Sequence, residues 1–335
     1  MKHVVLRAVL QAPPTAADFV VCAAPVPACP AGGVLTQVLC LSLDPYVGAR
    51  LRGRHMGEPP PSPNVEPIPG AVVGRVLESD AVGIAPGDFI HSMMGAWGEV
   101  VAIGPGMARR IEPELAPLSA YLGVLGMPGL TAWAGATKLA KVGSGDVVLV
   151  NAAAGAVGGS VGQIARLKGA ERVIGIAGGP EKCGLVVDRY GFDVCVDSEA
   201  SDWPSGLDAA LGGRGVSVHF ENVSAAMLAA GMSRLSPYGR VVLCGLADHY
   251  QAETGSAQIP IGLIIAKRAQ VHGLVVYDFY DRWDAFLMEA SPWVRDGRLC
   301  IAEDIATGLD NAPAHFEKLM QGRNVGKSIV VVNAE

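Results

Sequence analysis

The chain has 335 residues, of which half are hydrophobic and 17% are charged, and its formal net charge at pH 7 is -6. That length exceeds what a single hydrophobic core commonly serves, so about two domains are expected. The negative charge balance and the lack of a dense basic cluster argue against nucleic acid or an anionic membrane as a partner.

Two long stretches contain no charged residue, 115–137 and 147–165, but glycine or proline interrupts both. Neither resembles a lipid-facing helix of roughly 20 apolar residues. Near the N-terminus, Lys2 and Arg7 leave no unbroken apolar segment for a secretory signal. The seven cysteines are scattered and include no CxxC pair, which disfavours a disulfide framework and a zinc ribbon. We therefore expect a cytoplasmic protein that does not span a membrane.

Up to about Leu118, short β-like runs are separated by proline and glycine, a pattern typical of a small barrel or sandwich. The expected strands are 34–43, 70–77, 87–90 and 98–103. The proline-rich segment 59–63 is expected to form a surface loop, because proline cannot donate to a sheet ladder.

From Asp146 onward, apolar strands alternate with helical stretches, which predicts a parallel sheet covered on both faces. The expected strands are 146–151, 172–177, 194–197, 216–223, 240–244 and 271–276, and six is the number in a doubly wound sheet. The expected helices are 155–168, 180–190, 225–235, 261–268 and 282–296. From Arg298 the tail reads strand, helix, strand and is expected to rejoin the first domain. The expected domains are therefore 1–122 together with 298–335, and 123–297 between them.

The strand at 147–151 runs into the small-residue turn Ala152-Ala153-Ala154-Gly155-Ala156-Val157-Gly158 and then a helix. Small residues let the backbone approach a pyrophosphate, and a helix N-terminus offers unpaired N–H groups and the positive end of a dipole. Ala153 replaces the first glycine of GxGxxG, so the motif alone is also compatible with a helix packed closely on a sheet. The surrounding strand-helix-strand context favours a dinucleotide cradle.

The second strand of this region ends in Gly178-Gly179, where an NAD-specific site usually carries an acid for the ribose 2′-hydroxyl. Lys182, in the next helix, can place an ammonium beside a 2′-phosphate, although a solvated lysine would look the same in the sequence. The missing acid favours NADPH.

A competing motif, G-x-S-x-G at 158–162, would make Ser160 the nucleophile of a hydrolase, with His272 or His315 as its base. A nucleophile elbow places its serine at the strand-to-helix turn. The strand ends near Asn151, so Ser160 is expected inside the helix and the hydrolase interpretation is disfavoured.

No cysteine or histidine cluster in the first domain has ligand spacing, so no metal site is expected. Without a Lewis acid, hydride must go to an acceptor that is already activated, such as the β-carbon of an enone, and charge collects on the carbonyl oxygen. Tyr46 and Tyr250 are candidate donors to that oxygen. Either could also be an ordinary half-buried tyrosine.

Taken together, these residues resemble the zinc-independent leukotriene B4 12-hydroxydehydrogenase, prostaglandin reductase and curcumin reductase-like branch of the medium-chain dehydrogenase/reductase superfamily. The resemblance spans nearly the whole chain and rests on the following segments: Leu41-Ser42-Leu43-Asp44-Pro45-Tyr46, Gly126-Met127-Pro128-Gly129-Leu130-Thr131-Ala132, the turn at 152–158, Ala177-Gly178-Gly179-Pro180-Glu181-Lys182, Phe220-Glu221-Asn222-Val223, Cys244-Gly245 and Asn324-Val325-Gly326-Lys327.

The resemblance implies a Rossmann domain with a doubly wound parallel sheet, inserted into a GroES-like β-barrel domain. It also implies a homodimer and NADPH-dependent reduction of α,β-unsaturated carbonyl compounds. Tyr250 matches the tyrosine that assists at the substrate oxygen, and Tyr46 is expected to line the substrate pocket. The implied cofactor contacts are Met127, Thr131, Gly155, Ala156, Val157, Gly158, Gly179, Lys182, Ser198, Asn222, Cys244, Leu274, Val275, Val276 and Asn324.

Two departures from the family pattern matter. Ser198, flanked by Asp197 and Glu199, replaces a tyrosine near the 2′-phosphate, which loosens the expected preference for NADP. Val47-Gly48 replaces the usual Met-Arg after Tyr46, so a different pocket entrance is expected. A quinone reductase that uses the same cofactor, or a non-catalytic nucleotide-binding protein on the same fold, remains an alternative.

Overall fold

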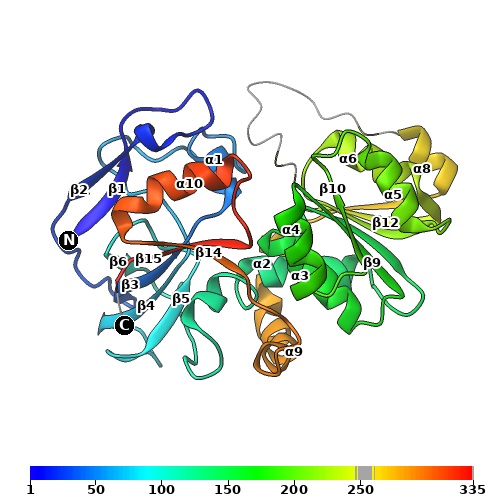
Figure 1. Ribbon diagram of the computed structural model, residues 1–335. Coiled ribbons are helices and arrows are strands. Elements are labelled where there is room, and N and C mark those ends of the chain that lie inside the picture. Colours follow the sequence, from blue (N-terminus) through cyan, green and yellow to red (C-terminus); the bar gives the residue numbers. More distant parts are fainter. Residues whose placement is uncertain (246, 248–258, 260, 334–335) are drawn as a thin grey trace. The chain divides into compact units, whose positions relative to one another are not determined.

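The computed structural model describes residues 1–245, 247, 259 and 261–333. The described residues fold into two compact units, one formed by residues 1–122 with 303–333, and the other by the described residues between 123 and 302. Figure 1 labels the elements of both units. Within the described residues, no helix is both long and apolar enough to cross a bilayer.

The first unit is built on a sheet in the order β14-β15-β3-β4-β5-β7, with β6 paired to β3. β15 runs antiparallel to β3, with Ile329 opposite Ser42, so the C-terminal tail extends the N-terminal sheet. A separate hairpin-like pair consists of β1 and β2. The strands are β1 (Lys2–Leu6), β2 (Phe19–Ala23), β3 (Val34–Ser42), β4 (Val72–Ser79), β5 (Phe89–Ser92), β6 (Val100–Ile103), β7 (Arg109–Arg110), β14 (Glu303–Thr307) and β15 (Lys327–Val331).

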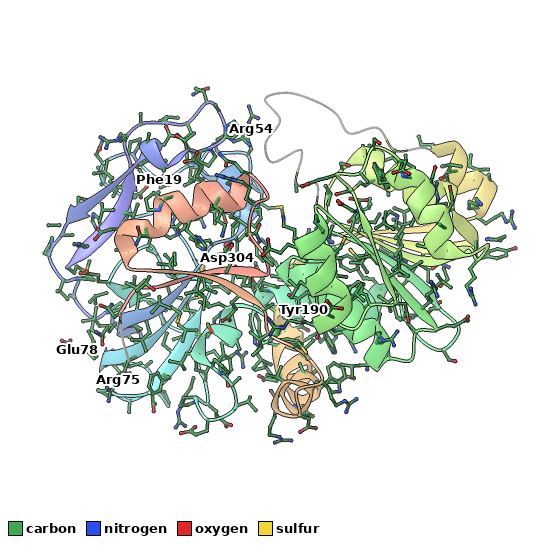
Figure 2. All side chains as sticks on the ribbon, in the orientation of Figure 1. Phe19, Arg54, Arg75, Glu78, Tyr190 and Asp304 are labelled. Carbon is green, nitrogen blue, oxygen red and sulfur yellow. The ribbon has the colours of Figure 1, made fainter. Side chains whose placement is uncertain are left out.

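Two helices of this unit, α1 (Pro45–Arg50) and α10 (Ala312–Met320), contact each other. Aromatic rings join α10 to the strands. Phe19 stacks on Trp97 with ring centroids 5.4 Å apart, and Phe316 of α10 meets both rings edge-on at 6.1 and 5.3 Å. Figure 2 labels Phe19 beside α10. This apolar cluster is the core of the first unit.

The second unit contains a six-stranded parallel sheet in the order β10-β9-β8-β11-β12-β13. Numbered within the sheet, this order is 3-2-1-4-5-6, which is that of a dinucleotide-binding doubly wound fold and confirms the predicted fold class. The strands are β8 (Val147–Asn151), β9 (Arg172–Ala177), β10 (Val194–Asp197), β11 (Val216–Glu221), β12 (Leu235–Leu243) and β13 (Gln270–Gly273).

Helices cover both faces of this sheet. On one face, β-strand side chains share a buried core with Leu207 of α5, Leu228 of α6 and Leu263 of α8, and Figure 1 shows these three helices together. On the other face, the helical segment Leu185–Arg189 packs against β9, since a Cβ added to Gly175 would lie 2.8 Å from Val186. The helices are α2 (Met127–Trp133), α3 (Ala156–Leu167), α4 (Pro180–Gly184), α5 (Trp203–Leu211), α6 (Ala225–Ser233), α8 (Ile261–Lys267) and α9 (Trp283–Arg295).

The structure corrects several predicted boundaries. The predicted helix 180–190 is a short α-helix that continues as a π-helix at Leu185–Arg189. The predicted helix 225–235 ends at Ser233, and β12 begins already at Leu235. The predicted strand 271–276 ends at Gly273, because a 3-10 helix begins at Val276. Helix α5 was not predicted, since Pro204 and Gly206 lower the helical signal of that segment.

Helix α3 lies against aromatic rings through its glycines. A Cβ added to Gly162 would lie 1.8 Å from Cζ of Phe192, and one added to Gly159 would lie 2.5 Å from the ring of Tyr190, which Figure 2 labels. Both rings are buried. Glycine at these positions therefore determines how closely α3 packs against the rings of Tyr190 and Phe192.

We predict that Gly162→Ala lowers the free energy of unfolding by about 1–3 kcal/mol, because the added methyl overpacks the contact with Phe192. Gly184→Ala is the matched control, since its Cβ would have only an ordinary 3.8 Å contact with Asp188. Urea unfolding measures both variants. Equal stability of the two variants would contradict the proposed seating of α3.

Candidate functional site

The turn between β8 and α3 brings helix and strand unusually close together. Ala152 has a φ of 48°, a left-handed conformation that is uncommon for a residue with a Cβ. A Cβ on Gly158 would lie 2.3 Å from the carbonyl oxygen of Ala152 and 3.0 Å from that of Asn151. Only glycine permits this approach, so Gly158 lets the first turn of α3 lie against the end of β8.

The N-terminus of α3 carries the properties of an anion site. Gly155 is the N-cap, and Gly155, Ala156 and Val157 are all partly exposed. The first N–H groups of an α-helix have no partner within the helix, and the dipole is positive at this end. β8 also lies next to β11, where the strand order reverses, and ligands of doubly wound sheets bind at that edge. The turn therefore fits a nucleotide's diphosphate.

A buried polar network joins the ends of β8 and β11. The side-chain amide of Asn151 donates to Oε2 of Glu221 at 2.7 Å, and the backbone N–H of Asn222 donates to Oδ1 of Asn151 at 2.8 Å. Nδ2 of Asn222 donates to the carbonyl oxygen of Asn151 at 3.0 Å. Asn151 and Glu221 are fully buried. These contacts hold Asn222, a predicted cofactor contact, in one position.

Glu221 also organises the next turns. Its Oε1 accepts from the N–H groups of Val223 and Ser224 at 2.6 and 2.9 Å, and its backbone carbonyl accepts from the N–H of Cys244 at 3.0 Å. His219 lies 3.4 Å from Oε2 of Glu221, and burial lowers the pKa of His219 to about 4. The imidazole is therefore neutral at pH 7, and its contact with Glu221 is not an ion pair.

The turns after β9 and β10 are tied together by Asp197. Gly179 has a φ of 82°, and its N–H donates to Oδ1 of Asp197 at 2.7 Å. The N–H of Ser198 donates to the carbonyl oxygen of Ala177 at 2.9 Å. Lys182 is half-buried in the short helix α4, two residues after its start. The predicted residues Gly179 and Ser198 thus belong to two adjacent turns at the carboxyl edge of the sheet, and Lys182 lies in the helix that follows the first of them.

Other predicted cofactor residues lie around the same edge or beside α3. Burial raises the pKa of the Cys244 thiol to about 12, so this thiol stays protonated at neutral pH. The N–H of Leu274 donates to the carbonyl oxygen of Leu243 at 2.9 Å, which places Leu274, Val275 and Val276 beyond the end of β12. On α2, a helix that contacts α3, the Thr131 hydroxyl donates to the carbonyl oxygen of Met127 at 2.7 Å.

The first unit contains Tyr46 and Asn324. Tyr46 is the second residue of α1, and its ring centroid lies 5.0 Å from that of His55. Just before α1, Asp44 accepts from the ammonium of Lys327 at 2.9 Å, and both side chains are buried. Nδ2 of Asn324 donates to the carbonyl oxygen of Gly326 at 2.8 Å. The start of α1 is therefore anchored to the C-terminal tail.

Two further predictions have different outcomes. Tyr250, the other candidate donor to the substrate oxygen, lies outside the described residues. Ser160 is buried inside α3, where its hydroxyl donates to the carbonyl oxygen of Ala156 at 2.7 Å. A serine with this geometry is no nucleophile elbow, which confirms that the hydrolase motif is coincidental.

The sequence alone indicates no anchoring role for Asn151, Asp44, Lys327 or Glu221, although all four lie in segments named above. Their partners are distant along the chain, and only strand pairing brings them together. In the part of the chain that the structure describes, no three His, Cys, Asp or Glu side chains gather closely enough to hold a metal ion.

Both units match models of oxidoreductase families. Residues 156–291, in the second unit, match a family model described as "Zinc-binding dehydrogenase". Residues 2–109, in the first unit, match one described as "N-terminal domain of oxidoreductase". The two matches together cover more than half of the chain.

Full-length relatives are more informative. The NADP-dependent 2-alkenal reductase of Nicotiana tabacum is 36% identical over 307 residues, covering 90% of this chain and 88% of that protein. The NADPH-dependent curcumin reductase of Escherichia coli K12 is 36% identical over 311 residues, covering 90% and 88%. CurA of Vibrio vulnificus, solved in complex with NADPH, has a TM-score of 0.91 and 33% identity and covers 100% of both chains. The chain accordingly belongs to the zinc-independent double-bond reductase family of medium-chain dehydrogenases/reductases.

Proposed function

We propose that this protein uses NADPH to reduce the C=C bond of α,β-unsaturated aldehydes and ketones. The observation that carries the proposal is the close approach at Gly158, which aims the N-terminus of α3 at the reversal point of a doubly wound sheet. Two relatives that match most of this chain at 36% identity are named for the reduction of alkenals and of curcumin.

The choice of NADPH rests on the turn after β9. That turn presents Gly178 and Gly179 where an acid would accept the ribose hydroxyls of NADH, and Lys182 follows within the first turn of α4. A cation at this place stabilises a 2′-phosphate. The relative from Vibrio vulnificus was solved with NADPH.

In the proposed mechanism, bound NADPH supplies a hydride to the β-carbon of the substrate. The N–H groups of Ala156 and Val157 would hold the diphosphate, and the network of Asn151 and Glu221 would keep Asn222 in place to contact the cofactor. Tyr46, with Tyr250, would donate a hydrogen bond to the carbonyl oxygen, where negative charge collects, and Tyr250 or water would then supply the proton that the enolate takes up at its α-carbon. Anchoring by Lys327 and Asp44 keeps α1, and so Tyr46, in place.

The direct test offers the purified protein NADPH together with a panel of 2-alkenals, enones and quinones. We expect NADPH oxidation with alkenals and enones, and products that mass spectrometry identifies as saturated at the former double bond. Turnover of quinones alone would assign the protein to the quinone reductases instead. Absence of heat on calorimetric titration with NADPH and with NADH would overturn the nucleotide site itself.

Tyr46→Phe removes one hydroxyl and keeps the ring that packs beside His55. We predict that kcat for an enone falls on the order of 100-fold, because one donor to the developing oxyanion is lost, while the Kd for NADPH stays unchanged. Tyr238→Phe is the control, since Tyr238 is 68% exposed on β12 and should affect neither quantity. An unchanged kcat in Tyr46→Phe would remove Tyr46 from the mechanism.

We also propose that the protein acts in the cytoplasm as a homodimer. The seven cysteines are all free, as suits a reducing compartment. Among the described strands, β13 is an edge of its sheet, and α8 beside β12 exposes Ile261 and Ile265 by 67% and 72%. Edge strands and exposed apolar side chains are stabilised by pairing with a second copy. Recovery of the protein in the membrane fraction of lysed cells would count against the cytoplasm.

The dimer proposal predicts that light scattering gives twice the chain mass for the wild type and the single-chain mass for Ile265→Lys, because the lysine would be buried without a partner. Val82→Lys is the control, since Val82 is 103% exposed in the other unit and its substitution should leave the dimer intact. A monomeric wild type, or an Ile265→Lys variant that remains dimeric, contradicts the interface.

A further inference from the structure

Glu199 places a carboxylate over Gly178 and Gly179, the two glycines that follow β9. Its Oε1 lies 2.9 Å from the position of a Cβ built on Gly178, and its Oε2 lies 3.5 Å from that built on Gly179. A side chain at either glycine would point at this carboxylate. An acid supplied by the turn after β10 therefore lies close to where NAD-specific sites carry an acid at the end of the second strand.

The backbone of this turn is fixed rather than loosely attached. Asp197 is paired in register with Ala177, the last residue of β9. Oδ1 of Asp197 accepts from the N–H of Gly179 at 2.7 Å and from the N–H of Glu199 at 2.9 Å. One carboxylate thus ties both turns together and sets the position from which the exposed Glu199 side chain extends.

The charges around these glycines oppose one another. Lys182 contributes one positive charge from α4, whereas Asp197 and Glu199 contribute two negative charges from β10 and its turn. Asp197 is engaged by two backbone N–H groups, so its charge is partly satisfied locally. Glu199 is exposed and remains available to repel a phosphate dianion or to accept hydrogen bonds from the two ribose hydroxyls.

We propose that Glu199 is a specificity-determining residue that weakens binding of the 2′-phosphate, so that this protein discriminates between NADPH and NADH less strongly than Lys182 alone would allow. The inference rests on the proposed function, because it concerns the adenosine end of the same nucleotide site. The weaker discrimination between NADPH and NADH is thereby attributed to one side chain, that of Glu199 in the turn after β10.

The test uses the nucleotide halves 2′,5′-ADP and 5′-AMP, which differ in the 2′-phosphate and carry no nicotinamide. Isothermal titration of Glu199→Gln should show about fivefold tighter binding of 2′,5′-ADP than the wild type, the effect of removing one nearby surface charge. Binding of 5′-AMP should stay the same or weaken. Raising the salt concentration should shrink the difference for 2′,5′-ADP, because exposed charges are screened.

Two variants serve as controls. Glu171→Gln removes the same charge just before β9, about 20 Å away along the strand, and should bind both ligands as the wild type does. Lys182→Gln should weaken the binding of 2′,5′-ADP by about tenfold and leave the binding of 5′-AMP unchanged. We expect Glu199→Gln to unfold at the same temperature as the wild type, because the Glu199 side chain is exposed.

The inference is overturned if Glu199→Gln binds 2′,5′-ADP no more tightly than the wild type, or if its affinity for 2′,5′-ADP and its affinity for 5′-AMP rise by the same factor. When the wild type still binds and oxidises NADPH, either result removes this inference and leaves the proposed function intact. A wild type that gives no heat with NADPH loses the proposed function, and the role of Glu199 falls with it.

Discussion

The second unit depends on the contact between the first turn of α3 and the carbonyl oxygens at the end of β8. Because a Cβ at Gly158 would lie 2.3 Å from the oxygen of Ala152, the helix can start at this depth only with glycine there. The depth is set again further along α3, where Gly159 and Gly162 lie against the rings of Tyr190 and Phe192. The diphosphate site at the N-terminus of α3 and the packing of α3 on its neighbours therefore both require small residues. A larger residue at one of these glycines would affect both the site and the packing.

The sheet edge that α3 faces is kept rigid by a buried carboxylate. Glu221 receives donors from the end of β8 and from the start of α6, while its backbone carbonyl receives the N–H of Cys244 after β12. A buried carboxylate is costly unless its oxygens accept hydrogen bonds, and here both side-chain oxygens do. The network therefore holds three strand ends in a fixed relation, which pre-organises the edge before any ligand arrives.

The sequence allowed the fold class and the β8-turn-α3 segment to be predicted, because each is encoded in neighbouring residues: an apolar strand, small turn residues and a periodic helix. Helix α5 could not be predicted in this way, since its Trp203-Pro204 start and internal Gly206 are weak local signals, and packing of Leu207 and Leu211 on the sheet compensates for them. The anchoring pairs are a different case. Asn151 and Glu221 are 70 residues apart and Asp44 and Lys327 are 283 apart, so only the topology brings them together.

These anchors fix the backbone at positions where the sequence was expected to depart from the family pattern. Val47 and Gly48 follow the ion pair of Asp44 and Lys327 by a few residues, and Ser198 and Glu199 directly follow Asp197, which ties two turns together. In both units a buried or engaged carboxylate fixes the backbone beside these side chains. A substitution beside an anchor changes the charge or shape offered to a ligand while the backbone that presents it stays in place. Specificity at an exposed position such as Glu199 can therefore change by a single residue at little cost in stability, whereas Val47 is buried and a Cβ on Gly48 would lie 2.6 Å from Met320.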